Sequence, residues 1–380
     1  MHSKKRLKVF IDGYLLNKEH QGTTTYIKEL YKEVALLNPN IEFYLGCFKD
    51  KKIIDEFEFI SNIQFINYKN ASRVYRMIFE IPKTIDRYKF DFAHFQYVIP
   101  LRKNKNCRYI NTIHDILFKD YQSLFSKKYK FQRDFLFKRS AKKADFLLTV
   151  SEYSKKAIQK HYKLNDKNIY LTPNGLNNSF FEKFDKQVVK DKILKKYGFS
   201  DFILYISRIE PRKNQELLLQ IYLETKLFDT STHLVLIGVN SLHNLKLQKI
   251  INSLTSNQKE KIHFYRNIDQ VSLMDFYRAA KMFVYPSKAE GFGIPPLEAG
   301  AVKVPVLCSN TTSMESYTFF NPYLCNPNNE VLFKEKFIHL FSNLDLLDFD
   351  EIQNEIKNKY SWKMSAKVIT SILNNSIDKV

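Results

Sequence analysis

The fold is decided by one stretch of the chain, Tyr285-Pro286-Ser287-Lys288-Ala289-Glu290-Gly291-Phe292-Gly293-Ile294-Pro295-Pro296-Leu297-Glu298. An apolar strand over Met282–Tyr285 leads into a glycine-containing loop, and Pro295 and Pro296 then start a helix. Proline suits the first helical turn because its missing N–H would have no partner there. The free N–H groups and the positive dipole end of such a helix start bind phosphate and other anions. The stretch therefore predicts a strand, a loop and a helix around an anion site.

Two glutamates lie at the borders of this loop. Glu290 follows the strand, and Glu298 falls in the first helical turn. Carboxylates beside an anion site suggest a ligand with both hydroxyl groups and phosphate, such as a nucleotide sugar. The spacing alone favours the simpler interpretation, a loop glutamate and a glutamate that stabilises the helix dipole. The strand, the glycines, the prolines and the spacing together favour the binding site.

The composition is that of a globular protein. A chain of 380 residues is long enough for two domains, and its hydrophobic content of 44% indicates real cores. No run of about 18 apolar residues exists, so no transmembrane helix is expected, and the first residues lack a signal peptide's apolar core. Cys47, Cys107, Cys308 and Cys325 lack metal-ligand spacing, which predicts reduced, mostly buried thiols in a cytosolic protein.

The formal net charge of +20 indicates attraction to a polyanion, either nucleic acid or an anionic membrane surface. Nucleic acid is not expected as a partner, because the sequence has no zinc-finger spacing, no RNP-type motif and no long basic arm. The segment Ser126–Lys143 combines lysines and arginines with aromatic residues. A helix of this kind either lies on anionic headgroups or is a surface helix whose lysines extend over one apolar stripe. The sequence does not distinguish between these two interpretations of the helix.

Both halves of the chain alternate short apolar runs with polar helical stretches. Such alternation predicts an α/β fold with mostly parallel sheets covered on both faces, and two similar halves predict a cleft between two sheets. The pattern loosens after Pro173-Asn174-Gly175, and we expect the domain boundary near residue 182. Ligands of parallel sheets bind at the carboxyl ends of strands, so the residues directly after each strand are the candidate site.

Three strand exits in the first half carry polar residues. Gly22 opens a helix with three threonines, which is either ordinary turn and cap chemistry or a contact to phosphate or acceptor. His114, followed by Asp115, ends a predicted central strand, where a structural role and a site role are equally open. Ser151 is expected to cap a helix.

Cations follow the first strand of the second half, in Ser207-Arg208-Ile209-Glu210-Pro211-Arg212-Lys213-Asn214. Arg208 offers a planar fork and Lys213 a point charge for phosphate oxygens, and neutralising a departing diphosphate helps it to leave. The alternative is that both side chains are merely solvated. The glycine loop should lie at a neighbouring strand end, and this placement favours the binding role.

These two stretches together resemble the signature of glycosyltransferase family 4, whose members are retaining, metal-independent enzymes with the GT-B fold. Further matches follow in order along the chain: Thr112-Ile113-His114-Asp115, Thr149-Val150-Ser151-Glu152-Tyr153-Ser154, Pro173-Asn174-Gly175 and Ser361-Trp362. The chain looks most similar to bacterial mannosyltransferase-like enzymes of surface-polysaccharide assembly. The resemblance implies two Rossmann-like domains facing each other across a cleft. Residues 1–182 would form the acceptor side and 183–360 the donor side, with a helix over 361–380 packing back on the first domain.

The resemblance also implies the roles of individual residues. Arg208 and Lys213 would hold the donor diphosphate, Glu290 would bind hydroxyls of the transferred sugar, and Glu298 would bind the ribose. His114 would line the reaction centre near the sugar. The backbone N–H groups that would contact sugar and phosphate belong to Gly291, Phe292, Gly293 and Ile294.

Three further positions relate to the family pattern. Gly22 would lie close to the phosphates, and Tyr265 and Arg266 would lie by the nucleobase. The chain departs from the pattern at Gly22, which is followed by three threonines instead of more glycines. It also departs at Arg266 and Lys303, which stand where glycine is common.

The function expected from the resemblance is transfer of a hexose, with mannose as the first choice, from a GDP- or UDP-type nucleotide sugar. The acceptor would be a lipid-linked or growing saccharide of lipopolysaccharide O-antigen, capsule or another surface polysaccharide. Neither a cofactor nor a metal ion is expected, because Arg208, Lys213 and the helix start would stabilise the leaving group. Attack would come from the front face, with the diphosphate taking the acceptor's proton. The enzyme would be cytoplasmic, peripheral at the inner face of the cell membrane.

Two other functions stay open from the residues alone. A glycosidase would use Glu290 and Glu298 as its carboxylate pair, although the neighbouring loop and cations fit a phosphate ligand better. A non-enzymatic basic protein that binds membranes or nucleic acid would account for the charge of +20. Asp348-Phe349-Asp350 has the form of a metal-binding DxD motif, but its place in a helix-rich tail predicts helix capping instead.

Overall fold

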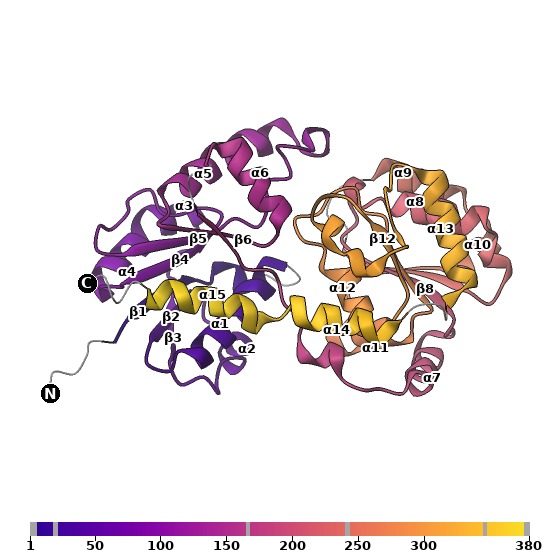
Figure 1. Cartoon of the computed structure of the whole chain (residues 1–380), viewed down its shortest axis with the longest axis horizontal. Coiled ribbons are helices and arrows are strands. Elements are labelled where there is room, and N and C mark those ends of the chain that lie inside the picture. The colour runs from indigo at the N-terminus through magenta and orange to yellow at the C-terminus, as the bar shows by residue number, and fades with distance from the viewer. Residues whose placement is uncertain (1–5, 18–21, 165–167, 240–243, 345–347, 376–380) are drawn as a thin grey trace. The chain divides into compact units, whose positions relative to one another are not determined.

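The computed structural model describes residues 6–17, 22–164, 168–239, 244–344 and 348–375. It divides into two compact units, one made of the chain up to Gly175 together with the segment from Ser361, the other of Leu176–Tyr360 (Figure 1). This division falls before residue 182, where the looser sequence had suggested a boundary. No helix in the described part of the chain is long and apolar enough to cross a membrane.

Unit 1 is built on a parallel sheet with the strand order β3-β2-β1-β4-β5-β6-β7. Its strands are short and apolar, and the inner ones are buried because helices cover the sheet. The strands are β1 Lys8–Asp12, β2 Glu42–Cys47, β3 Ile63–Asn67, β4 Phe92–Gln96, β5 Arg108–Thr112, β6 Phe146–Thr149 and β7 Ile169–Leu171. The helices are α1 Gly22–Leu37, α2 Lys51–Asp55, α3 Arg73–Tyr75, the π-helical turn η2 Arg76–Glu80, α4 Ile81–Tyr88, α5 Lys127–Lys143 and α6 Glu152–Tyr162.

Unit 1 is completed by a helix from the other end of the sequence, α15 Trp362–Asn374, which packs against α1. The indole of Trp362 meets the Tyr26 ring at a centroid distance of 6.1 Å, and Ser365 donates a hydrogen bond of 2.6 Å to the carbonyl of Pro173. Gly175 has to be glycine, since a Cβ there would lie 2.2 Å from the backbone nitrogen of Trp362.

Unit 2 repeats the scheme with the strand order β10-β9-β8-β11-β12-β13. All pairings are parallel, so the carboxyl ends of its strands meet at one edge of the sheet. The strands are β8 Phe202–Ile206, β9 His233–Ile237, β10 Ile262–Tyr265, β11 Met282–Tyr285, β12 Val306–Ser309 and β13 Leu324–Cys325. The helices are α7 Lys186–Tyr197, α8 Gln215–Glu224, α9 Leu245–Ser253, α10 Ser256–Lys261, α11 Gln270–Ala279, α12 Ile294–Ala301, α13 Glu330–Ser342 and α14 Phe349–Lys359.

Two predicted helix caps are confirmed. The Ser151 hydroxyl accepts a hydrogen bond of 3.1 Å from the N–H of Ser154 at the start of α6. Asp348 caps α14 by accepting from the N–H of Glu351 at 2.9 Å. The Asp348-Phe349-Asp350 motif therefore has the structural role that its place in the sequence predicted.

Candidate active site

The site in unit 2 forms where two neighbouring strands end. β8 and β11 pair directly, as the sequence predicted for the cation-bearing and glycine-bearing stretches. The short turn η5, Pro211–Lys213, follows β8, and the loop of residues 286–293 follows β11. Backbone joins them, since the N–H of Lys288 donates to the carbonyl of Arg212 at 2.8 Å. This contact brings cations from one strand exit to the glutamate of the other.

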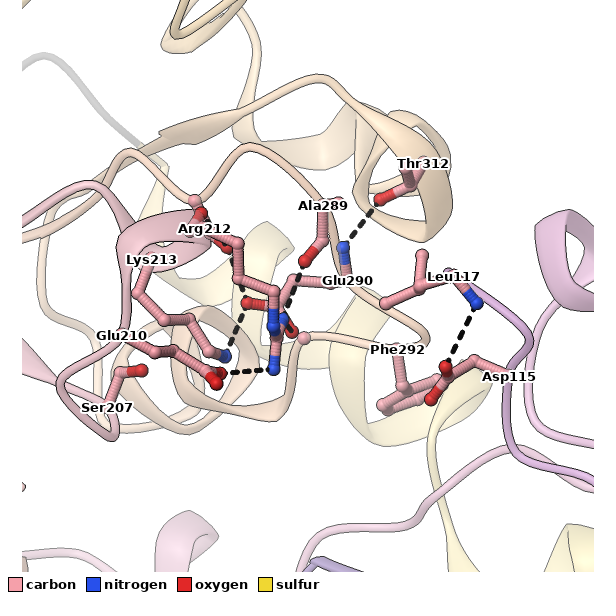
Figure 2. A network of polar contacts seen from close by, with 12 residues as sticks. Asp115, Leu117, Ser207, Glu210, Arg212, Lys213, Ala289, Glu290, Phe292 and Thr312 are labelled. Carbon is pink, nitrogen blue, oxygen red and sulfur yellow. Dashed lines mark hydrogen bonds and ion pairs between the residues drawn. The ribbon is translucent and has the colours of Figure 1, made fainter. Parts of the chain in front are cut away.

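The carboxylate of Glu290 is the centre of this site (Figure 2). Its Oε1 atom accepts from the Lys213 ammonium at 2.5 Å, from the Ser287 hydroxyl at 2.6 Å and from the Tyr285 hydroxyl at 2.9 Å. The Lys213 ammonium also donates to the Tyr285 oxygen at 2.9 Å. Glu290 and Lys213 are both buried, so the ion pair lies largely out of water.

Arg212 supplies the second cation, and no role for it was predicted from the sequence. Its Nη1 atom donates to the carbonyl of Ala289 at 2.7 Å and to Glu290 Oε2 at 3.0 Å, while Nη2 lies 2.6 Å from Glu210 Oε1 (Figure 2). The planar guanidinium therefore bridges the two strand exits and two carboxylates. The available signal was the run Glu210-Pro211-Arg212-Lys213, in which charges of both signs share one tight turn.

These contacts decide the charge states of the network. Burial by itself would raise the pKa of Glu290, but the charges of Lys213 and Arg212 outweigh it and hold the pKa at about 2. Burial and the nearby Arg212 lower the pKa of Lys213 to about 8, against the attraction of Glu290. Burial opposes the charge of Arg212 too, yet Glu290 and Glu210 raise its pKa. At neutral pH Glu290 and Arg212 are ionised, and Lys213 is mostly so.

The loop after Glu290 is fixed by hydroxyl groups from residues 311–317. Thr312 accepts from the N–H of Glu290 at 2.8 Å, and Ser313 donates to the carbonyls of Glu290 and Phe292 at 2.9 and 2.7 Å. Gly293 has φ +90°, and a Cβ there would lie 2.9 Å from the Met314 side chain, so the turn requires glycine. Helix α12 then begins at Ile294 with prolines in its first turn, as predicted.

Glu298 lies in the second turn of α12 and not in the first, where the sequence had predicted it, and its environment differs from that of Glu290. Its Oε2 accepts a hydrogen bond of 2.5 Å from Tyr277 of α11, a partner that the sequence gave no reason to expect. Burial raises the pKa of Glu298 to about 7, although the Tyr277 hydroxyl opposes the shift. The two glutamates that frame the loop therefore differ in charge state near neutral pH.

The other predicted residues of unit 2 lie at or directly after the carboxyl ends of β8 and β10, at the same edge of the sheet. The side chain of Arg208 is exposed directly after β8, and its carbonyl accepts from Gln215 Nε2 at 2.8 Å. Tyr265 ends the edge strand β10, where its ring meets those of Tyr197 and Phe276 at 5.4 and 5.6 Å. Arg266 follows and is exposed. The geometry thus joins Lys213 to Glu290 and leaves the two arginine side chains open to solvent.

In unit 1, His114 follows the interior strand β5 and is buried. Its Nε2 atom lies 2.7 Å from Gln96 Oε1, and the Tyr26 ring meets it edge-on at 4.7 Å. Burial lowers the pKa of His114 to about 3, so the ring is neutral at physiological pH. Gly22 is the first residue of α1, and a Cβ added there would meet open space.

We expect the substitution Glu290→Gln to lower the free energy of unfolding of unit 2 by about 3 kcal/mol, because it leaves two buried cations with Glu210 alone. Urea denaturation at pH 7 measures the change. The control is Glu224→Gln, which breaks the exposed pair with Lys334, 2.7 Å long, and should cost less than about 1 kcal/mol. Equal losses in the two variants would contradict the central place of Glu290.

The raised pKa of Glu298 predicts a pH-dependent stability. The folded protein keeps a proton that the unfolded chain releases, so the stabilising contribution is complete below the unfolded value of about 4.5 and is lost as pH rises through about 7. Glu298→Gln should therefore unfold like the wild type at pH 4 and be more stable than it at pH 8. Urea titrations across this range test the difference. Glu260→Gln, at an exposed position of α10, is the control and should show no such divergence.

Comparison with known proteins agrees with this geometry. Residues 188–360 match the family model for glycosyl transferases group 1, and residues 20–180 match that for glycosyltransferase family 4. The O-antigen chain mannosyltransferase RfbU of Salmonella typhimurium is 29% identical over 62% of this chain and 60% of its own length. O-antigen chain mannosyltransferase B of Escherichia coli is 26% identical over 81% of this chain and 84% of its own length.

The fold also has solved counterparts. Sucrose-phosphate synthase from Thermosynechococcus elongatus superimposes with a TM-score of 0.77 at 16% identity, covering 99% of this chain and 100% of that one. At this identity the likeness concerns the fold, which is that of two parallel-sheet α/β units. Together with the matches to both family models, it places the chain in glycosyltransferase family 4, with the GT-B fold.

Proposed function

We propose that this protein transfers a hexose from a nucleotide sugar to a lipid-linked or growing saccharide acceptor in the synthesis of a bacterial surface polysaccharide such as O-antigen or capsule. The observation that carries the proposal is the Glu290–Lys213–Arg212 network at two adjacent strand exits of a family 4 chain. Mannose is the first candidate sugar, because both relatives described above are named as O-antigen mannosyltransferases.

The proposed donor site uses the two kinds of charge at the strand exits. The exposed guanidinium of Arg208, the Lys213 ammonium and the start of α12 would bind the diphosphate and stabilise the charge that develops as it leaves. Because these groups already provide the positive charge, we propose that transfer requires no metal ion. Glu298, in the second turn of α12, would accept hydrogen bonds from hydroxyls of the ribose.

The proposed reaction retains the configuration of the sugar. The acceptor oxygen forms a bond to the anomeric carbon on the face from which the diphosphate departs, and a diphosphate oxygen takes the acceptor's proton. Glu290 is a poor base for this proton because its pKa is about 2, and it is a poor nucleophile because Oε1 already accepts from three donors. We assign it instead to fixing the loop and meeting sugar hydroxyls. His114, being neutral, would contribute hydrogen bonding only.

A glycosidase is the second candidate, because the pKa values of about 2 for Glu290 and about 7 for Glu298 are split as in an acid and nucleophile pair. The donors around Glu290 disfavour it, since a nucleophilic carboxylate needs an accessible lone pair. Hydrolysis of aryl glycosides without any nucleotide sugar would favour this candidate over the transferase.

The donor proposal is tested by thermal shifts with GDP, UDP, dTDP and their sugars. One nucleotide is expected to raise the melting temperature of the wild type by several degrees, because a ligand that binds only the folded state stabilises it. Arg208→Ala should lose most of this shift, whereas Arg102→Ala, an exposed arginine of unit 1, should keep it. If no nucleotide stabilises the wild type, the proposal fails, and the responding base otherwise names the donor.

The mechanism is tested on the product. NMR spectroscopy of the transferred sugar should show the anomeric configuration of the donor, and the initial rate should survive EDTA unchanged. An inverted product would rule out front-face attack. Complete loss of activity in EDTA, restored by a divalent cation, would show that the protein's own cations do not suffice.

A further inference from the structure

An unexpected apolar surface lies on the helix that runs through α3, η2 and α4, residues 73–88. Its buried face carries Arg76, Met77, Ile81 and Ile85. Its outer face exposes Val74 by 67%, Tyr75 by 46%, Ile78 by 37% and Phe79 by 59%. The rings of Tyr75 and Phe79 contact each other at 5.4 Å. A helix of a globular protein normally directs such side chains to the core, so this contiguous outer face indicates a binding surface.

Helix α5 presents a second surface of the same kind. Phe131 and Phe135, one turn apart, are 82% and 68% exposed. The basic residues of this helix are Lys127, Lys128, Lys130, Arg133, Lys138, Arg139, Lys142 and Lys143. Its one acid, Asp134, pairs with Lys119 at 2.9 Å. The outward charge of α5 is therefore positive, and aromatic rings lie among the charges.

The two surfaces are adjacent at Arg73 of α3 and Arg133 of α5. Figure 1 shows both helices in unit 1. Arg73, at the start of the 73–88 helix, interacts electrostatically with Arg133 of α5 and with Arg76. The Arg133 guanidinium lies over the Tyr129 ring, 4.0 Å from its centroid. A stacked guanidinium keeps its N–H groups at the edge of the plane, where they can donate to an anion.

Arg76, on the buried face of the 73–88 helix, stabilises the start of that helix. It is buried, lies 3.8 Å from the centroid of the Tyr14 ring, and donates from Nη1 to the carbonyls of Asn70 and Ala71 at 3.1 and 2.9 Å. These bonds hold the turn from which the 73–88 helix starts. The carboxylate of Asp12 interacts electrostatically with both Arg73 and Arg76, and it accepts a hydrogen bond of 2.7 Å from Tyr68. Arg73 and Arg76 thus share the charge of Asp12, Arg133 adds a third guanidinium that interacts with Arg73, and an anion would balance the excess.

We propose that Val74, Tyr75, Ile78, Phe79, Phe131 and Phe135 form one docking surface for an anionic lipid bilayer, on which Arg73 and Arg133 bind a lipid phosphate. The choice of a lipid rests on the proposed lipid-linked acceptor. The chemistry favours a bilayer over the alternatives, because aromatic and basic side chains together suit the headgroup region. Val74 and Ile78 could not stack on the bases of a nucleic acid but can enter the acyl boundary. A second copy of this basic surface would repel the first.

Sedimentation of the full chain with vesicles tests the surface. The wild type should bind vesicles of phosphatidylcholine with phosphatidylglycerol and not vesicles of phosphatidylcholine alone. Tyr75→Ser with Phe79→Ser, or Phe131→Ser with Phe135→Ser, should weaken the partition about tenfold, since each pair removes two inserted rings. Phe59→Ser is the control, because Phe59 is 92% exposed in the same unit but lies in the segment between α2 and β3, outside the two helices of this surface. Unchanged melting temperatures would show that the variants fold.

The phosphate site is tested by adding a polyprenyl diphosphate to neutral vesicles. The wild type should bind these more tightly than plain neutral vesicles, and Arg73→Gln with Arg133→Gln should remove that gain. Arg87→Gln, an exposed arginine on α4, should leave it intact. If the aromatic variants bind anionic vesicles like the wild type, or if single-stranded RNA binds this surface and vesicles do not, the inference is wrong. A nucleotide thermal shift on the same samples separates this failure from failure of the proposed transferase.

Discussion

A carboxylate taken out of water has to be neutralised where it lies, and the buried side chain of Glu290 imposes this requirement on unit 2. Desolvating one ion costs several kcal/mol, which only close countercharges and hydrogen bonds offset. Lys213 and Arg212 provide the charges, and both come from the turn after β8. Their position is therefore tied to that of the loop after β11. The strand exits are held together by electrostatics as well as by the pairing of the two strands.

Because the buried carboxylate of Glu290 has to be neutralised, the cations of the site have different roles. Lys213 and Arg212 are paired with Glu290 and keep their positions, so the diphosphate of the proposed donor would have to come to Lys213. Arg208, which is exposed, can turn towards an incoming ligand. A rigid pair beside one adaptable guanidinium fits a site that orders its loop before a charged ligand arrives.

Much of this arrangement could be predicted from the sequence because it depends on local patterns. β11 has the predicted bounds, since a short apolar run between polar segments leaves little choice of where the strand begins and ends. The start of α12 followed from its prolines, and the caps at Ser151 and Asp348 from their side chains.

What the sequence could not reveal depends on direction and on distant partners. The sequence places Arg212 and Lys213 in one turn, Pro211–Lys213, but only the structure shows that both side chains pair with Glu290. Tyr277 and Glu298 lie on separate helices, so their hydrogen bond leaves no trace in spacing. The π-helical turn Arg76–Glu80 changes the spacing of side chains around its helix. A search of the sequence for apolar residues at a period of 3.6 therefore does not detect the outer apolar face. The unit division near Gly175 reflects a close backbone contact with Trp362 that composition does not encode.

That contact has a consequence for how the chain is made. Unit 1 takes its last helix, α15, from residues that follow the whole of unit 2, so a ribosome finishes unit 2 before it supplies the partner of α1. Until then the nascent first unit lacks the cover that Trp362 and Ile369 give it, whereas unit 2 is continuous and can close its own core as it emerges. The order of synthesis therefore makes the second unit the first to be complete.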